Sequence, residues 1–293
     1  MQAILLAAGF GTRLQPYTNM RPKPLFPVLN QPLLYRLLEQ LRRCECRSVV
    51  VNCHHLASQL QAALTSYPGV LVQYEPEILG TGGTLRQALD SLDDEPVLVV
   101  NGDLYHQINL EQVYHQHLLS KHDVTLALHD YPRFNQVAVE DNLVRRFGSS
   151  SVGSLAFTGI HVVDPEAIER IPAKGFYHII DLYKQLAEEG RVGFCRVDGA
   201  LWRDIGTPAD YLQLHGELLQ GQTQWLIDPQ AQVGADVVLE GWGCIGPQAE
   251  IGDGSRLSCC VVWDDAKVPA GSCQSDTILT GDQSLDNQSG ESR

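Results

Sequence analysis

A short glycine turn followed by two cations stands near the start of the chain. Gly9 and Gly11 frame the turn, and Arg13 and Lys23 follow it in the string G-F-G-T-R-L-Q-P-Y-T-N-M-R-P-K-P. Glycine lets the backbone bend sharply and present bare N–H groups to an anion. Arginine adds a planar fork and lysine a point charge around the same anion. The pattern therefore predicts a site for a phosphate-bearing ligand.

Two aspartates further along the chain predict a place for a hard metal ion. Asp103 comes after the apolar run 97–100 and Asn101-Gly102, and Asp204 lies in the string L-W-R-D-I-G-T-P. Ligands of open α/β sheets bind beyond the carboxyl ends of strands, where Asp103 is expected. Thr207 can cap the helix that follows Asp204, which leaves that carboxylate available. Paired carboxylates beside phosphate groups suit Mg²⁺.

The elements that would position these residues alternate between strand and helix. The apolar run 3–8 is typical of a buried parallel strand, and further strands are expected at 48–52, 70–74 and 96–100. Helical spacing is found at 33–43, 54–64 and 84–92. This alternation predicts an α/β domain with a doubly wound, mostly parallel, Rossmann-like sheet. Later strands are expected at 124–128, 136–139, 156–163 and 192–197, and later helices at 111–119, 177–189 and 208–220.

After about residue 222 the pattern changes to an aliphatic residue at every sixth position. The repeat is carried by Ile227, Val233, Leu239, Ile245, Ile251 and Leu257, and it slips afterwards. Such a repeat is typical of a left-handed parallel β-helix, here of about three coils. We therefore expect an α/β domain over residues 1–222, a short β-helix over 223–281 and a polar, disordered tail over 282–293. The β-helix is expected to pack either on the α/β domain or on a second subunit, and the second arrangement would give a homo-oligomer.

Composition narrows the function classes. The formal net charge of −14 argues against nucleic acid or an anionic membrane as a partner. The eight cysteines show none of the paired spacing of a zinc site and predict reduced thiols in a cytoplasmic protein. No segment reaches the roughly 20 apolar residues that span a bilayer, and the apolar start lacks a basic leader.

The opening string resembles the signature of the sugar-1-phosphate nucleotidyltransferases, also called nucleotide-sugar pyrophosphorylases. The resemblance implies a Mg²⁺-dependent enzyme that joins a nucleoside triphosphate to a sugar-1-phosphate and releases pyrophosphate. It implies catalytic roles for Arg13 and Lys23 and metal ligands in Asp103 and Asp204. The nucleotide-binding residues that it implies around the turn are Ala7, Ala8, Gly9, Gly11 and Thr12.

Two further segments resemble parts of the same family. The string L-G-T-G-G-T at 79–84 matches the segment that reads the nucleotide base, which makes Gly80, Thr81 and Gly82 candidates for base and ribose contacts. The string F-T-G-I at 157–160 resembles the segment that lines the sugar pocket, which assigns Thr158 and Gly159 to the sugar. Glu140 falls where a sugar hydroxyl is held.

The substrates and one rival function stay open at this point. The chain most resembles the branch that contains mannose-1-phosphate guanylyltransferases and N-acetylmuramate-1-phosphate uridylyltransferases. Within this branch the resemblance favours GTP as the nucleotide, then UTP, and after these the thymidine and adenosine triphosphates. Residues 143–148 lack the Glu-Lys-Pro of many relatives, which would suit a regulatory relative that binds nucleotide-sugar without catalysis. A glycosyltransferase would need an Asp-x-Asp metal site, and Asn101-Gly102-Asp103 lacks its first aspartate.

Overall fold

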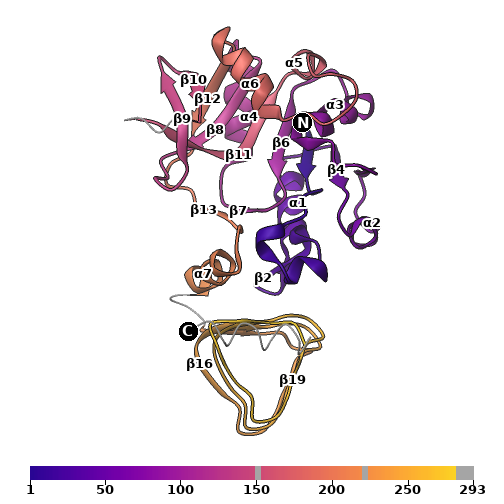
Figure 1. Cartoon of the computed structure of the whole chain (residues 1–293), viewed down its shortest axis with the longest axis vertical. Coiled ribbons are helices and arrows are strands. Elements are labelled where there is room, and N and C mark those ends of the chain that lie inside the picture. The colour runs from indigo at the N-terminus through magenta and orange to yellow at the C-terminus, as the bar shows by residue number, and fades with distance from the viewer. Residues whose placement is uncertain (149–152, 220–223, 282–293) are drawn as a thin grey trace. The chain divides into compact units, whose positions relative to one another are not determined.

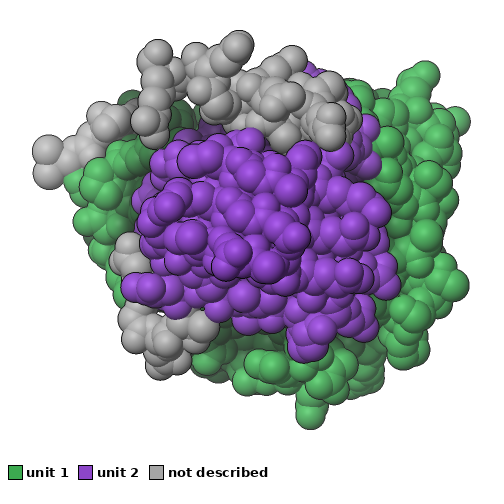
Figure 2. Space-filling view, turned by 90° about the horizontal axis from the view of Figure 1, so that it is seen from below, with its two compact units in different colours: residues 1–10, 36–202 green, residues 11–35, 203–293 purple. Residues whose placement is uncertain are grey.

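The computed structural model describes residues 1–148, 153–219 and 224–281, which form two compact units (Figure 2). The first unit contains residues 1–10 and 36–202, and the second contains residues 11–35 together with the chain from Arg203 onward. The signature segment thus shares a unit with the C-terminal part of the chain. The expected domain boundary near residue 222 and the expected tail at 282–293 lie outside the described residues and stay predictions.

A nine-stranded sheet forms the centre of the first unit (Figure 1). Strands β5, β4, β1 and β6 are parallel neighbours, whereas β11 is antiparallel to β6 and β8, and β10 is antiparallel to β12 and β9. The predicted α/β sheet is therefore present, with two reversed strands. In sheet order the strands are β5 (Val70–Tyr74), β4 (Ser48–Cys53), β1 (Gln2–Leu6), β6 (Val97–Asn101), β11 (Leu155–Val163), β8 (Val124–His129), β12 (Val192–Arg196), β10 (Leu143–Phe147) and β9 (Asn135–Glu140).

The helices follow the apolar periodicity of the sequence. Helix α1 (Leu33–Arg43) has the predicted bounds, and α2 (Ala57–Leu64) begins late because Leu56 adopts a left-handed conformation. Helix α3 (Gly80–Ala88) begins earlier than predicted and includes the glycines that were expected in a loop. The remaining helices are α4 (Leu110–Leu119), α5 (Pro165–Glu169), α6 (Ile179–Glu188) and α7 (Pro208–Leu219); short strands are β2 (Pro27–Val28), β3 (Gln31–Pro32), β7 (Leu104–His106) and β13 (Trp202–Asp204).

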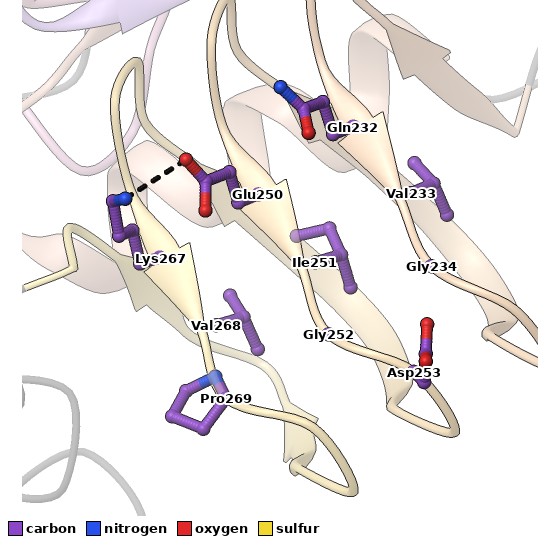
Figure 3. Close-up of a pocket in the computed structure, with 10 residues that line it drawn as sticks. All are labelled: Gln232, Val233, Gly234, Glu250, Ile251, Gly252, Asp253, Lys267, Val268 and Pro269. Carbon is purple, nitrogen blue, oxygen red and sulfur yellow. Dashed lines mark ion pairs between the residues drawn. The ribbon is translucent and has the colours of Figure 1, made fainter.

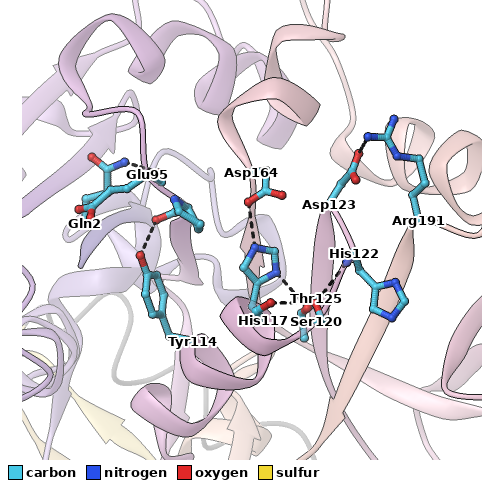
Figure 4. A network of polar contacts seen from close by, with 11 residues as sticks. Gln2, Glu95, Tyr114, His117, Ser120, His122, Asp123, Thr125, Asp164 and Arg191 are labelled. Atoms are coloured by element: carbon cyan, nitrogen blue, oxygen red, sulfur yellow. Dashed lines mark hydrogen bonds and ion pairs between the residues drawn. The ribbon is translucent and has the colours of Figure 1, made fainter.

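A polar network ties α4 to the amino ends of the sheet strands (Figure 4). The buried His117 ring contacts Thr125 Oγ1 and Asp164 Oδ1, each at 3.0 Å. Beside it, Arg191 pairs with Asp123 at 2.6 Å. Asp123 precedes β8 and Asp164 follows the antiparallel β11, so this network lies at the opposite end of the strands from the loops that follow β1 and β6. The contacts give the buried His117 ring its hydrogen-bond partners and link α4 to β8 and to the end of β11.

The second unit contains stacked coils of short parallel strands, which Figure 1 shows end-on as nested triangles. Trp225 pairs with Gly243 and Gln232 with Glu250, each 18 residues further on, whereas Glu250 pairs with Lys267, 17 residues further on. This shortening is the predicted slip of the repeat. The strands are β14 (Trp225–Ile227), β15 (Gln232–Val233), β16 (Val238–Ile245), β17 (Glu250–Ile251), β18 (Arg256–Val262), β19 (Lys267–Val268), β20 (Cys273–Ser275) and β21 (Ile278–Leu279).

The six-residue repeat forms the core of these coils. Ile245, Ile251 and Leu257 are buried, whereas Ile227 and Val233 of the first coil are each 41% exposed. The first coil is more open because, in the described chain, β14 and β15 have a parallel neighbour on one side alone. Across the described residues, no helix is both long and apolar enough to cross a membrane.

Candidate active site

The two signature cations converge on one carboxylate within the second unit. Lys23 Nζ lies 3.4 Å from Asp204 Oδ1, and an Arg13 guanidinium nitrogen lies 3.6 Å from Asp204 Oδ2. The Lys23 side chain is buried, whereas that of Arg13 is 62% exposed. A Cβ on Gly206 would lie 2.9 Å from Asp204 Oδ2 and 3.0 Å from an Arg13 guanidinium nitrogen. A glycine at position 206 therefore leaves room for Arg13 and Asp204 to approach each other. The structure thus brings together three of the predicted site residues.

The signature segment is built from three consecutive 3₁₀ turns, η1 (Thr12–Leu14), η2 (Tyr17–Asn19) and η3 (Lys23–Leu25). Gly11 begins the first turn with φ 60°, and a Cβ there would lie 2.8 Å from Thr18 Cγ2. The Thr18 hydroxyl donates to the Gly11 carbonyl at 3.1 Å. Gly11 is therefore required both by its left-handed conformation and by its close packing.

Asp103 lies at the carboxyl edge of the sheet in the first unit, beside the end of β1. Leu6 is in register with Asn101, and the Gly102 N–H donates to the Leu6 carbonyl at 2.8 Å. A Cβ on Gly102 would lie 2.7 Å from that carbonyl. The chain therefore leaves β6 directly against the start of the glycine turn, which places Ala7 and Asp103 on neighbouring loops, as the strand pattern predicts.

A buried carboxylate outside the sequence motifs links the end of β1 to the start of α3 in the first unit. Glu75 is fully buried and accepts hydrogen bonds from Asn52 Nδ2 at 2.8 Å, Thr84 Oγ1 at 2.6 Å and the Leu79 N–H at 3.2 Å. Asn52 Oδ1 in turn accepts from the Ala7 N–H at 2.6 Å. These contacts fix the end of β1 and the start of α3 to each other. The signal was polar residues at the ends of two predicted strands, Asn52 and Glu75.

The glycines at 80–83 serve close packing between backbone segments. The Gly82 N–H donates to the Tyr177 carbonyl at 2.9 Å, and a Cβ on Gly82 would lie 2.7 Å from Tyr177 Cδ1. Thr81 Oγ1 accepts from the Ile179 N–H at 3.1 Å. The Gly82 amide is thus already bonded within the protein, and the assignment of Gly80, Thr81 and Gly82 to base and ribose stays a prediction.

The three residues predicted to bind the sugar differ in their burial and in their position on the sheet. Thr158 is fully buried, and its hydroxyl donates to the Ala127 carbonyl at 2.8 Å. Gly159 has φ 78° at an irregularity of β11, and a Cβ there would lie 2.6 Å from Asn101 Nδ2, so this segment reaches the same sheet edge as Asp103. Glu140 is exposed and pairs with Arg145 at 3.5 Å. Their roles in sugar binding stay predictions.

The carboxylates Asp103 and Asp204 are the hard oxygen donors that Mg²⁺ prefers. Asp204 is not needed as a helix cap, because Thr207 Oγ1 accepts from the Asp210 N–H at 3.1 Å, as predicted. The described residues contain no group of three or more His, Cys, Asp or Glu side chains that could hold a metal. Each of these carboxylates could supply an oxygen ligand to such an ion, whose remaining ligands would be phosphate oxygens and water.

A separate pocket lies on the coils of the second unit (Figure 3). It is lined by residues of β15, β17 and β19 and the turns that follow them, and Glu250 pairs with Lys267 there at 2.9 Å. None of the predicted site residues lines it.

A comparison with protein-family models finds one family that matches most of the chain. The family model described as nucleotidyl transferase matches residues 2–221. The chain belongs to the nucleotidyl transferase family. Its matched span contains the predicted catalytic, nucleotide, sugar and metal residues.

Three relatives of this nucleotidyl transferase show the range of substrates. A mannose-1-phosphate guanylyltransferase of Mycobacterium tuberculosis is 29% identical, over 92% of this chain and 82% of that protein. A D-glycero-alpha-D-manno-heptose 1-phosphate guanylyltransferase of Aneurinibacillus thermoaerophilus is 28% identical, over 74% of this chain and 98% of that protein. An N-acetylmuramate alpha-1-phosphate uridylyltransferase of Caulobacter vibrioides is 28% identical, over 74% of this chain and 97% of that protein.

Solved structures share the fold. The crystal structure of HddC from Yersinia pseudotuberculosis has a TM-score of 0.63 at 24% identity, covering 74% of this chain and 99% of that one. A sucrose-bound structure from Bacillus anthracis has a TM-score of 0.67 at 19% identity, covering 76% and 96%. At these identities the likeness concerns the fold.

Proposed function

We propose that this nucleotidyl transferase joins a nucleoside triphosphate to a sugar-1-phosphate, giving a nucleoside diphosphate sugar and pyrophosphate. The observation that carries the proposal is the convergence of Lys23 and Arg13 on the Asp204 carboxylate, 3.4 and 3.6 Å away. Lysine and arginine side chains that pair with a carboxylate can also pair with the oxygens of a phosphate group. The sugar-phosphate activities in the names of the relatives supply the substrate class.

The reaction needs no covalent enzyme intermediate. An oxygen of the sugar phosphate attacks the α-phosphorus in line, a new P–O bond forms, and the bond from that phosphorus to the pyrophosphate oxygen breaks. Catalysis then consists of positioning and neutralising charge. Lys23 is buried and suits the crowded negative charge between the α-phosphate and the incoming phosphate. The exposed Arg13 suits the leaving pyrophosphate.

Mg²⁺ is the metal we propose for this site, with Asp103 and Asp204 as its protein ligands. When bound, the ion would neutralise phosphate charge and polarise the reacting phosphoryl group. As a ligand of such an ion, Asp204 would no longer balance Lys23 and Arg13, and the charges of these two residues would be available to the phosphates.

GTP with mannose-1-phosphate, or with a related manno-configured sugar phosphate, is the substrate pair that we favour. Guanylyltransferases recur among the relatives, and one of them spans 92% of this chain. UTP with an amino-sugar phosphate is the second choice, because a uridylyltransferase is similar over 74% of the chain.

The absent Glu-Lys-Pro keeps a regulatory, non-catalytic relative as the rival function. In its place, residues 143–147 form strand β10, where Arg145 pairs with Glu140 and Asp141. Arginine can bind a phosphate as lysine does, so this replacement is compatible with either function.

Pyrophosphate release across a grid of nucleoside triphosphates and sugar-1-phosphates tests the proposal. The panel holds the phosphates of mannose, glucose, N-acetylglucosamine, N-acetylmuramate and heptose. Release in one or two combinations, abolished by Asp103→Asn, is expected. Silence across the grid, with saturable binding of a nucleotide-sugar, would support the regulatory rival.

We further propose that the coils form a left-handed parallel β-helix over residues 223–281, attached to a catalytic domain over 1–222, in a cytoplasmic protein. The partly exposed Ile227 and Val233 of the first coil support packing of the β-helix in a homo-oligomer. A solution mass equal to one chain would contradict the oligomer.

A further inference from the structure

We propose that one corner of the coils, Trp263-Asp264, is a positioning element for Lys23, so that the β-helix takes part in nucleotidyl transfer. The inference rests on the proposed function of Lys23. All of the contacts involved lie within the second unit, which contains both the signature segment and the coils.

Asp264 holds the residue two positions before Lys23. The Arg21 guanidinium forms two parallel hydrogen bonds with the Asp264 carboxylate, at 2.6 and 2.8 Å. The two side chains are 22% and 33% exposed, so water screens the pair only in part. A two-point arginine–carboxylate contact fixes direction as well as distance. It therefore holds the backbone that enters the Pro22-Lys23-Pro24 turn.

Trp263 contacts the signature segment on both sides of Lys23. Its ring lies 4.6 Å below the Arg21 guanidinium carbon, and its centroid lies 4.8 Å from that of Phe26, three residues after Lys23. It also lies 6.1 Å from the ring of Tyr17. Trp263 is 2% exposed, so a large rigid side chain fills the space beneath the turn.

A hydrogen-bond chain completes the attachment. Trp263 Nε1 donates to the Tyr211 hydroxyl at 3.3 Å, and that hydroxyl donates to the Pro27 carbonyl. Burial raises the pKa of Tyr211, which keeps the hydroxyl protonated and able to donate. Asn30 Nδ2 donates to the Ile245 carbonyl of β16 at 2.8 Å. The coils thus hold the segment from residue 17 to residue 30 at several points.

These contacts determine where the ammonium of Lys23 can lie. The Phe26 N–H donates to the Lys23 carbonyl at 3.0 Å, and the Leu25 N–H donates to the Pro22 carbonyl at 2.8 Å, so the turn moves as one piece. Loosening Arg21 or Phe26 would shift the Lys23 side chain relative to Asp204. Because Lys23 is assigned to charge that grows in the transition state, the shift should lower kcat and leave KM for the nucleotide nearly unchanged.

Asp264→Asn tests the inference, with Asp265→Asn as the matched control. Asp265 is the exposed neighbour, loses the same charge, and has a left-handed φ of 59° that asparagine tolerates. We expect Asp264→Asn to lower kcat about tenfold or more, with KM for the nucleotide within about twofold and the midpoint of thermal unfolding close to wild type. Asp265→Asn should match the wild type in all three.

A charge swap separates positioning from general stability. Arg21→Asp and Asp264→Arg should each lower kcat, and the double variant should recover a large part of it. Equal kcat in the wild type and Asp264→Asn would overturn the inference while leaving the proposed function intact. A wild type that forms no product would overturn the proposed function itself. Asp264→Asn could also lose kcat together with a lower unfolding midpoint, without recovery in the double variant. That result would overturn the inference, because it would show that Trp263-Asp264 stabilises the fold and does not position Lys23.

Discussion

Lys23 Nζ and Asp204 Oδ1 lie 3.4 Å apart although the two residues are separated by 181 positions in the sequence. Arg13 approaches the other oxygen of the same carboxylate. Asp204 therefore balances both signature cations and, in our proposal, gives them up to the phosphates. In the proposed function, the release of these two cations presents positive charge to a triphosphate although the chain carries a net charge of −14.

Gly9→Ala and Gly11→Ala should separate substrate binding from folding. A Cβ at Gly9 meets nothing within 4 Å, whereas one at Gly11 lies 2.8 Å from Thr18 in a residue with φ 60°. We expect Gly9→Ala to unfold like the wild type but to raise KM for the nucleotide, because in our proposal the glycine turn binds the phosphates and the added methyl would crowd them. Gly11→Ala should lower the free energy of unfolding by about 1–2 kcal/mol. Urea unfolding and initial-rate kinetics measure both; normal kinetics in Gly9→Ala would remove Gly9 from the nucleotide site.

Glu75→Ala should destabilise the first unit and reduce activity together. It leaves Thr84 Oγ1 and the Leu79 N–H without their acceptor and removes one of the two acceptors of Asn52 Nδ2, at a cost of about 2–4 kcal/mol. Glu75→Gln should cost less, because one acceptor oxygen remains. The exposed Glu77→Gln provides the control. Urea unfolding measures the difference, and a Glu75→Ala protein as stable as the control would show that the network contributes little.

Stability should fall in acid partly because of His161. The ring is fully buried, neither nitrogen has a hydrogen-bond partner within the described parts of the chain, and burial lowers its pKa to about 3. The unfolded chain, with a histidine pKa of about 6.5, binds the proton more readily. Below pH 6.5 the free energy of unfolding therefore decreases, by roughly 2 kcal/mol at pH 5 from this residue.

His161→Phe should remove that part of the pH dependence. Urea unfolding at pH 7 and pH 5 measures it, with the exposed His115→Phe as the matched control. An unchanged difference between the two pH values in His161→Phe would contradict the assignment.

Local periodicity allowed much of the fold to be predicted. The apolar spacing of residues 33–43 predicted α1 with its observed bounds, and the six-residue repeat predicted parallel coils. Strand β10 was missed because its alternating pattern is interrupted by Arg145 and Arg146. The start of α3 was placed late because three glycines favour a loop by propensity, whereas packing against Tyr177 keeps them helical.

Long-range polar contacts could not be predicted in the same way. The bonds of Glu75 with Asn52 and Thr84, and of Arg21 with Asp264, join residues whose spacing in sequence follows no period. Motifs identified single groups such as Lys23 and Asp204, but their convergence depends on how the chain returns to the signature segment.

The most direct test of the account is the turnover of Lys23→Ala with the substrate pair that the wild type accepts, followed by mass spectrometry of the nucleotide-sugar and by pyrophosphate release. We predict equimolar nucleotide-sugar and pyrophosphate from the wild type, and a rate lower by a factor on the order of 10²–10³ in Lys23→Ala with an unchanged unfolding midpoint. Near-native turnover in Lys23→Ala would contradict the account.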